Sequence, residues 1–261
     1  MRRRRTVPAL LLATSVFVTL IALTGAQSTG ATAGPRLLGR LAAAMFELDR
    51  WTPSHQEDIA ASMREGSRGL IEIDGLPVGV SVPPSAVVDG GSGLAQAIAS
   101  AAGEDLYANG RLAFVDGQGA KGDISLTQPS RWAIGLVEQE DHANWRAFLL
   151  IAAAVSLAAF AVVSLTSISG FGGAVRMVAI ACALSTVAFM LAWALTQLAS
   201  HASSSPPDQE VARMLGDCIR IGLQDAVIVG IAAGVLNSAL RQFTTSVARV
   251  RQWRPAFDET A

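Results

Sequence analysis

The sequence predicts a membrane all-α bundle of four transmembrane helices with an inserted extracytoplasmic α+β domain. Of the 261 residues, 51% are hydrophobic and only 16% are charged, and the mean hydropathy is +0.41. A helix needs roughly 20 apolar residues to cross a bilayer, and four segments reach or approach that length. These segments are residues 7–25, 147–166, 177–199 and 221–240.

The distribution of charge predicts the orientation. Nine arginines and only two acidic residues, Asp258 and Glu259, lie in three segments that share one side if the four spans cross in succession. Residues 34–144 instead carry eight Lys or Arg against fifteen Asp or Glu. Because basic segments stay in the cytoplasm, we expect a plasma-membrane protein with both termini cytoplasmic and residues 34–144 outside. The Arg-rich, Lys-poor composition is typical of a bacterial protein.

The first 33 residues are an N-terminal membrane anchor with a linker, or alternatively a signal peptide. Thr24-Gly-Ala26 and Ala31-Thr-Ala33 both offer the small residues of a cleavage site. We favour an uncleaved anchor, because the apolar run is long for a signal peptide and further spans follow. The other predicted parts are the α+β domain (34–144), a three-helix transmembrane block (145–240) and a basic cytoplasmic tail (241–261).

Helical and strand patterns alternate in the first half of the domain. An apolar stripe from Pro35 predicts a helix that ends near Trp51, and the capping box at residues 54–57 predicts a second helix through Arg64. Asp74-Gly75 is typical of a tight hairpin turn, so we expect strands at residues 70–73 and 76–82. Pro77 has no N–H to donate, which restricts the second strand to a sheet edge.

The second half of the domain repeats this alternation. Residues 93–107 have a helical apolar pattern that Asn109-Gly110 stops. A glycine-rich turn predicts a second hairpin, with strands at residues 111–116 and 123–128. Ser130 predicts the start of a helix that continues through an acidic group towards the second span. The domain is therefore expected to be α+β, with more helix than strand.

Small residues recur at every fourth position of the fourth span, which predicts close helix packing. The packing residues are Gly222, Ala226, Gly230, Gly234 and Ser238, preceded by Cys218. In lipid, helices associate where small side chains let backbones approach closely. Each step of four residues rotates about 40° beyond a full turn. The series therefore sweeps around the helix and predicts contacts with more than one neighbour.

Asp225 is the one charged residue within the predicted spans. It lies about four residues, or roughly 6 Å, inside the outer end of the fourth span. A carboxylate inside a membrane is costly, and its default reading is functional. The structural alternative is that it pairs with Arg146 or Gln197, or that it reaches interfacial water. We predict an ion pair between Asp225 and Arg146.

The remaining chemistry-bearing residues form no recognised catalytic or metal-binding motif. His142 and His201 are both expected near acidic residues at the outer boundary, but neither HExxH nor CxxC spacing is present. Cys182 and Cys218 are expected at different depths of the membrane, too far apart for a disulfide. We expect no enzymatic activity, no cofactor, no metal and no nucleic-acid partner.

These observations favour a non-enzymatic scaffold, binding or accessory subunit that acts through its external domain. Its expected partners are the lipid bilayer and a membrane-protein partner or a second copy of the chain. Arg249, Arg251 and Arg254 beside Trp253 predict a short interfacial helix on anionic lipid, stopped by Pro255. The order of span, external domain and three spans is similar to that of FtsX-type permeases. This resemblance, in topology alone, implies a transporter subunit whose external domain answers to a cytoplasmic ATPase.

Overall fold

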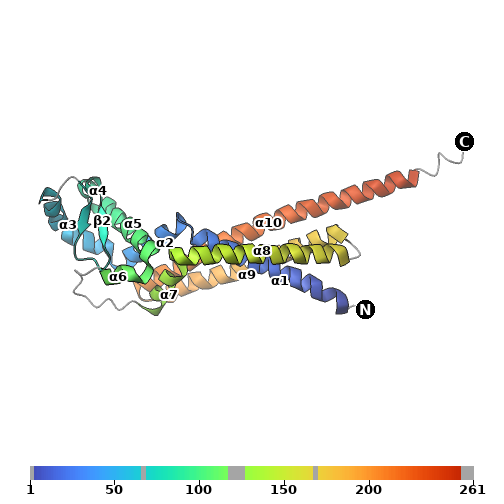
Figure 1. The fold of residues 1–261 in the computed structure, drawn as a ribbon, viewed down its shortest axis with the longest axis horizontal. Coiled ribbons are helices and arrows are strands. Elements are labelled where there is room, and N and C mark those ends of the chain that lie inside the picture. The colour runs from blue at the N-terminus through green and yellow to red at the C-terminus, as the bar shows by residue number, and fades with distance from the viewer. Residues whose placement is uncertain (1–2, 66–68, 117–126, 167–169, 254–261) are drawn as a thin grey trace, which may run out of the picture. The chain divides into compact units, whose positions relative to one another are not determined.

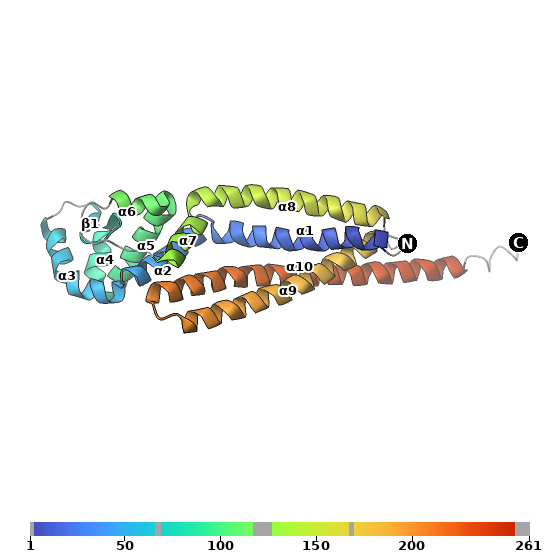
Figure 2. The same cartoon turned by 90° about the horizontal axis from the view of Figure 1, so that it is seen from below.

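The computed structural model describes residues 3–65, 69–116, 127–166 and 170–253, and these are almost entirely helical (Figures 1 and 2). The chain divides into two compact units. The first, called the span unit here, comprises Met1–Leu23, Phe148–Leu191 and Arg220–Ala261. The second, called the domain unit, comprises Thr24–Ala147 and Ala192–Ile219. Each unit has its own hydrophobic core.

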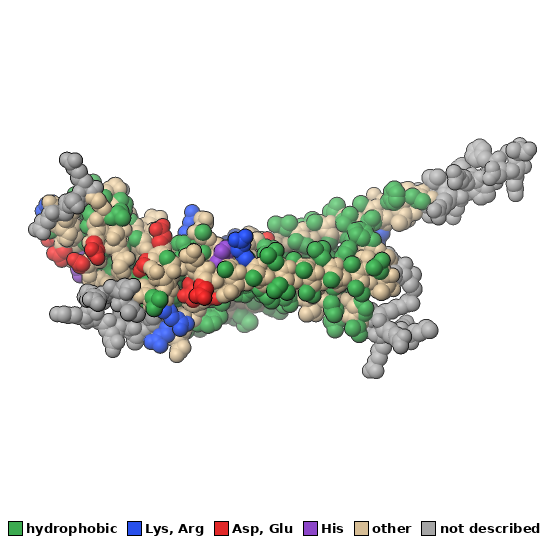
Figure 3. All heavy atoms as spheres, in the orientation of Figure 1, with side chains coloured by type: hydrophobic (Ala, Val, Ile, Leu, Met, Phe, Trp, Pro, Cys, Tyr) green, Lys and Arg blue, Asp and Glu red, His purple; other side chains and the backbone are tan. Residues whose placement is uncertain are grey.

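Within the described residues, four helices are long and apolar enough to cross a membrane, as expected of a helical multi-pass membrane protein. They are α1 (Arg3–Ser28), α8 (Gln139–Thr166), α9 (Gly170–Ala202) and α10 (Pro206–Trp253). Hydrophobic side chains cover much of the visible surface of α8 and α10 in the span unit (Figure 3). The boundary between the two units falls within each of these helices, so the domain unit contains one end of all four.

Small and apolar side chains hold the span unit together. Leu12 of α1 is fully buried with Ala159 and Val163 of α8 and Ala174 of α9. The hydroxyl oxygens of Thr19 and Ser156 lie 2.8 Å apart across α1 and α8. This hydrogen bond satisfies two polar groups that lipid could not.

The domain unit contains six further α-helices among its described residues, one 3-10 helix and two short strands. These elements are α2 (Ala33–Met45), α3 (Leu48–Glu65), β1 (Ile71–Ile73), β2 (Val80–Val82), α4 (Pro84–Asp89), α5 (Gly91–Asn109), η1 (Gly110–Leu112), α6 (Ala113–Asp116) and α7 (Gln128–Val137).

The boundary predicted between the first two domain helices is wrong. The first helix ends at Met45 rather than near Trp51, because Glu47 adopts a positive φ of 45° and turns the chain. That turn places Leu48, which is 1% exposed, in the core. The expected capping serine lies inside α3, where Ser54 Oγ donates to the carbonyl of Trp51 at 2.8 Å.

The first predicted hairpin is confirmed, although its strands are shorter. Strands β1 and β2 pair antiparallel, with Ile71 opposite Val82 and Ile73 opposite Val80. Their connection is longer than a two-residue turn and buries Leu76 and Val78, so it contributes to the core. Pro77 lies in this connection rather than in the edge strand that was predicted for it.

The second predicted hairpin is wrong in its first half. Residues 110–116, where a strand was expected, form η1 and α6. Residues 117–126, with the expected turn and most of the second strand, lie outside the described residues. Within the described part of the chain, the sheet is therefore a single two-stranded hairpin.

Helix α5 is the centre of the domain core. Leu94, Ile98, Ala102 and Leu106 along one face of it are all fully buried. Its backbone touches that of α2, because a Cβ on Gly103 would collide with the Pro35 carbonyl and with Gly39. Glycine permits this close crossing, since a larger residue would push the two helices apart.

The end of α1 is also packed into the domain unit. The Trp145 ring covers Gly25 so closely that a Cβ there would overlap it. Thr29 accepts a hydrogen bond at its carbonyl from the Tyr107 hydroxyl at 2.9 Å, and its own hydroxyl lies 3.1 Å from His142 Nδ1. These contacts connect α1, α5 and α8.

Candidate binding site around Arg40

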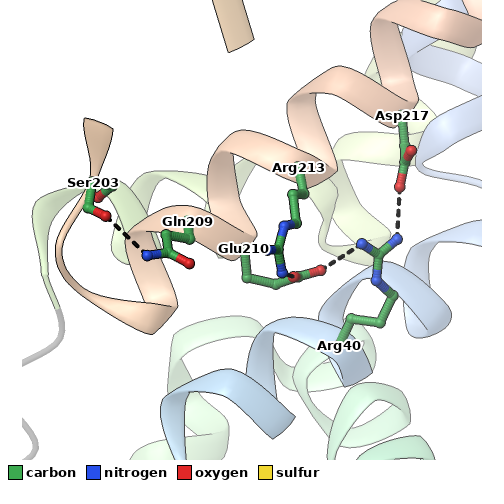
Figure 4. Close-up of polar contacts among 6 residues, drawn as sticks. All are labelled: Arg40, Ser203, Gln209, Glu210, Arg213 and Asp217. Carbon is green, nitrogen blue, oxygen red and sulfur yellow. Dashed lines mark hydrogen bonds and ion pairs between the residues drawn. The ribbon is translucent and has the colours of Figure 1, made fainter. Parts of the chain in front are cut away.

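Arg40 on α2 connects the domain to the first turns of α10 (Figure 4). Its Nη2 lies 2.6 Å from Glu210 Oε1, and its Nη1 donates to Asp217 Oδ2 at 2.6 Å. The two acidic residues are seven positions apart, which is close to two helical turns, so they share one face of α10. A single guanidinium therefore binds two carboxylates that are about two turns apart on α10.

Glu210 is the buried member of this cluster. The residue is 7% exposed, and Arg213 Nη1 donates to its Oε2 at 3.4 Å. Its Oε1 forms the short ion pair with Arg40. A buried carboxylate is tolerated when it is paired, so Arg40 and Arg213 are what permit Glu210 in this position.

The same pairing keeps Arg40 charged. Partial burial lowers the pKa of Arg40, but the hydrogen bond that Arg40 donates to Asp217 and the negative charges of Glu210 and Asp217 outweigh this effect and raise the pKa above its ordinary value. Apolar contacts add to these ion pairs in holding α10, because Val211 and Met214 of α10 are buried in the domain core.

Polar contacts also fix the first turn of α10. The Ser205 hydroxyl accepts from the backbone N–H of Asp208 at 3.3 Å, as an N-cap residue does. Thr127 Oγ1 donates to Asp208 Oδ1 at 2.9 Å, and Gln209 Nε2 donates to the Ser203 carbonyl at 2.9 Å (Figure 4). The start of α10 is thus connected to the segment before α7.

Two open grooves meet at Arg40. The larger, the α2–α5 groove, has a volume of about 970 Å³, and the smaller, the α2–α10 groove, about 400 Å³. Several small residues line the α2–α5 groove, including Gly39, Ala43, Ala95 and Ala99.

Charges of both signs line the α2–α5 groove. Arg36 and Arg40 come from α2, while Asp49 lies on α3 and Glu104 on α5. Ser92, Gln96 and Ser100 add neutral hydrogen-bonding groups along α5. The groove can therefore bind a polar chain by hydrogen bonds and by ion pairs of either sign.

The predicted packing residues of the fourth span lie in different environments on α10. Gly222 and Ala226 are buried, and a Cβ on Gly230 would lie 3.2 Å from Cys182 Cβ of α9. A Cβ on Gly234 would meet nothing within 4 Å, and Ser238 is exposed. A role of these residues in assembly stays a prediction.

The two residues of the predicted intramembrane ion pair lie in different units. Asp225 is half-buried on α10 in the span unit, and Arg146 is exposed on α8 in the domain unit. Their ion pair therefore stays a prediction. The described residues contain no group of three or more His, Cys, Asp or Glu side chains that could hold a metal ion.

Sequence reasoning missed Arg40 and its partners. The signal was present in Glu210 and Asp217, whose spacing of seven puts two acids on one face of a helix just before an apolar span. Arg40 itself carries no such signal, because its partners lie about 170 residues further along the chain. The chain matches no protein-family model, no curated protein and no solved structure.

Proposed function

We propose that this protein is a plasma-membrane scaffold or accessory subunit, without enzymatic activity, whose domain unit binds a protein partner outside the cytoplasm. The observation that supports this most is the α2–α5 groove. It is partly open to the surface and has a volume of about 970 Å³, which is enough space for a short polypeptide segment. Its small lining residues let the backbone of a bound segment approach closely. Its two arginines and two carboxylates can form charge-assisted hydrogen bonds with that segment.

The attachment of α10 suits a scaffold. The ion pairs of Arg40 and the burial of Val211 and Met214 fix the first turns of α10 in the domain core. Arg40 therefore both lines the groove and contacts this helix. A partner bound in the groove would lie next to Arg40, which pairs with a helix that continues into a span.

The packing of α1 supports the retained anchor. Ala26, in the first candidate cleavage site, is helical and 9% exposed, and Thr29 between the two sites is 2% exposed. Cleavage after Ala33 would remove Gly25 and Thr29, with their contacts to Trp145, Tyr107 and His142. The excess of arginine outside the domain supports the proposed orientation.

The proposal is tested by placing a photo-crosslinking amino acid at Gln96 in the full chain and irradiating intact cells. Gln96 is exposed on α5 and lines the groove. The matched control position is Glu57, which is exposed on α3 and lines none of the described grooves. We expect one discrete protein adduct from position 96, weakened by Glu104→Arg, and none from position 57. Equal adducts from both positions, or none from either, would contradict the proposal.

The alternative is a permease-like subunit of FtsX-type topology. The continuity of α10 from the domain core to Trp253 favours it, because one helix connects the domain to the C-terminal segment. The two proposals differ in the partner on the cytoplasmic side. A permease should co-purify with a nucleotide-binding subunit after crosslinking in native membranes, whereas a scaffold should not.

A further inference from the structure

A third groove, the α7–α8 groove, has a volume of about 710 Å³ and differs in composition from the two at Arg40. It lies between η1, α7 and the first turn of α8. The chain kinks at Glu138, whose ψ of 158° separates α7 from α8, although a continuous helix was predicted there. Gly110, with a φ of 54°, lets the chain pass directly against the Glu138 side chain.

One wall of this groove is acidic. Glu138, Glu140 and Asp141 lie within four consecutive residues at the start of α8. Burial, together with the negative charges of Asp141 and Glu140, raises the pKa of Glu138, while Arg111 lowers it. The groove as a whole therefore has three carboxylates and one arginine in its lining, which favours a positively charged ligand group.

The opposite wall combines one cation with an apolar edge. Arg111 Nη2 donates to the Arg131 carbonyl at 3.2 Å and lies over Gly135, where a Cβ would approach it to 3.1 Å. Trp132 is 52% exposed and Leu112 is 67% exposed, although both belong to the domain unit. Acidic and basic side chains lie next to each other over α7 and the start of α8 (Figure 3).

The groove lies close in the sequence to the start of the apolar run of α8. Asp141 precedes Trp145 by four residues and the apolar run at Ala147 by six, which is about 6 to 9 Å along the helix axis. The headgroup layer is roughly 5 to 8 Å thick on each side of the hydrocarbon core. Asp141 therefore lies at the outer edge of this layer, within reach of lipid headgroups.

We propose that the α7–α8 groove binds the headgroup of a zwitterionic aminophospholipid. The acidic wall binds the ammonium, and Arg111 binds the phosphate. Trp132 and Leu112 contact the glycerol and the first methylenes, because an exposed indole is favourable at a membrane interface. Three carboxylates against one arginine disfavour a headgroup with net negative charge. This inference is independent of the proposed protein partner.

Native mass spectrometry of the full chain, solubilised in detergent, tests the proposal. The protein is mixed with phosphatidylethanolamine or phosphatidylglycerol, and the fraction of lipid-bound protein is measured for each. We expect wild type to retain phosphatidylethanolamine preferentially, and Glu140→Gln with Asp141→Asn to reduce that retention about three- to tenfold. Asp74→Asn, which neutralises an exposed carboxylate in the β1–β2 connection, should change nothing.

A charge reversal distinguishes a headgroup site from general adhesion to lipid. Asp141→Lys should shift the preference towards phosphatidylglycerol, and Trp132→Ala should reduce retention of both lipids. The melting temperature of each variant shows that it is folded. Equal retention of the two lipids by wild type, or an Asp141→Lys variant with unchanged preference, would overturn the proposal.

Discussion

Arg40 forms ion pairs with two carboxylates that lie on one face of α10. Its guanidinium reaches two carboxylates on α10, and one of them, Glu210, is buried. Arginine suits this position, because its planar fork presents separate N–H groups to two acceptors. Most exposed ion pairs contribute little, but Glu210 would remain buried and only partly compensated without Arg40.

Replacing Arg40 should therefore lower the stability of the domain unit. We expect Arg40→Glu to destabilise it by about 1 to 3 kcal/mol, between the values for exposed and buried pairs, since Arg40 is itself 46% exposed. Arg40→Lys should have a smaller effect. The measurement is the thermal unfolding of the solubilised full chain.

Arg50→Glu is the matched control for this prediction. Arg50 pairs with Glu47 at 3.0 Å, but the side chains are 85% and 53% exposed. We expect its reversal to change stability by less than about 0.5 kcal/mol. If Arg40→Glu unfolded at the same temperature as Arg50→Glu, the ion pairs of Arg40 with α10 would contribute nothing measurable to the stability of the protein.

Glu138 should make stability depend on pH. Burial and the charges of Asp141 and Glu140 raise its pKa in the folded protein, so the folded state binds a proton more readily than the unfolded state. The contribution of protonated Glu138 to the free energy of unfolding is fully present below the ordinary pKa of glutamate. It is lost as pH rises through the raised pKa that Glu138 has in the folded protein. At neutral pH, Glu138→Gln should therefore melt at a higher temperature than wild type.

The pH series checks the sign of this effect. Without added phospholipid, the difference between Glu138→Gln and wild type should shrink as pH falls towards the ordinary pKa of glutamate. Arg111 is the cation that opposes the shift, so Arg111→Gln should enlarge the difference at neutral pH. A Glu138→Gln variant that is less stable than wild type at neutral pH would show that the carboxylate is stabilising instead.

At the scale of elements, α10 presents small residues to different surroundings along its length. Gly230 faces Cys182 of α9, whereas the position of Gly234 opens onto free space within the described chain. Gly230→Leu should therefore disrupt the packing of α9 with α10 and lower the melting temperature by several degrees, because overpacking costs about 1 to 3 kcal/mol. Val229→Leu, at a position 39% exposed, should not.

Gly234→Leu separates packing within the chain from packing against a partner. The single chain has space for this side chain, so its melting temperature should stay near that of wild type. If a second membrane protein or a second copy covers this face, crosslinked assemblies should nevertheless disappear in the variant. If neither Gly230→Leu nor Gly234→Leu changed the melting temperature or the crosslinked assemblies, the small-residue series would have no role in helix packing.

The sequence predicted the elements whose patterns are local. The spans follow from apolar length and the end of α5 from Asn109-Gly110; the first hairpin follows from the strands on either side of Asp74-Gly75, although the connection is longer than the tight turn predicted there. The turn at Glu47 could not be predicted, because a positive φ at glutamate has no sequence signal and depends on the burial of Leu48. Residues 113–116 have a strand-like composition, but Ala113 packs against the domain core as part of a helix.

The binding site was less predictable than the fold. The ion pairs of Arg40 and the crossing of Gly39 with Gly103 join residues that are distant in the sequence. Neither pattern can be read from one segment alone. The predicted interfacial helix of the tail is the continuation of α10 through Trp253, because no proline or glycine interrupts residues 235–254. Its binding to anionic lipid stays a prediction.

At the scale of the whole molecule, the length of α10 requires it to extend beyond the membrane. Its 48 residues span about 72 Å, against roughly 30 Å of hydrocarbon. Its first turns belong to the domain core, and its last turns belong to the basic C-terminal segment. We therefore propose that α10 crosses the membrane once, with its first turns outside and its C-terminal end in the cytoplasm.

Labelling of single cysteines in intact cells tests this arrangement most directly. Cys182 and Cys218 are replaced by Ala, and one cysteine is introduced in place of either Ser62 on α3 or Ser246 on α10, both of which are exposed. The reagent is a thiol-reactive probe that does not cross membranes. The account predicts that Ser62→Cys is labelled in intact cells and Ser246→Cys only after permeabilisation. Labelling of Ser246→Cys but not Ser62→Cys in intact cells would contradict it.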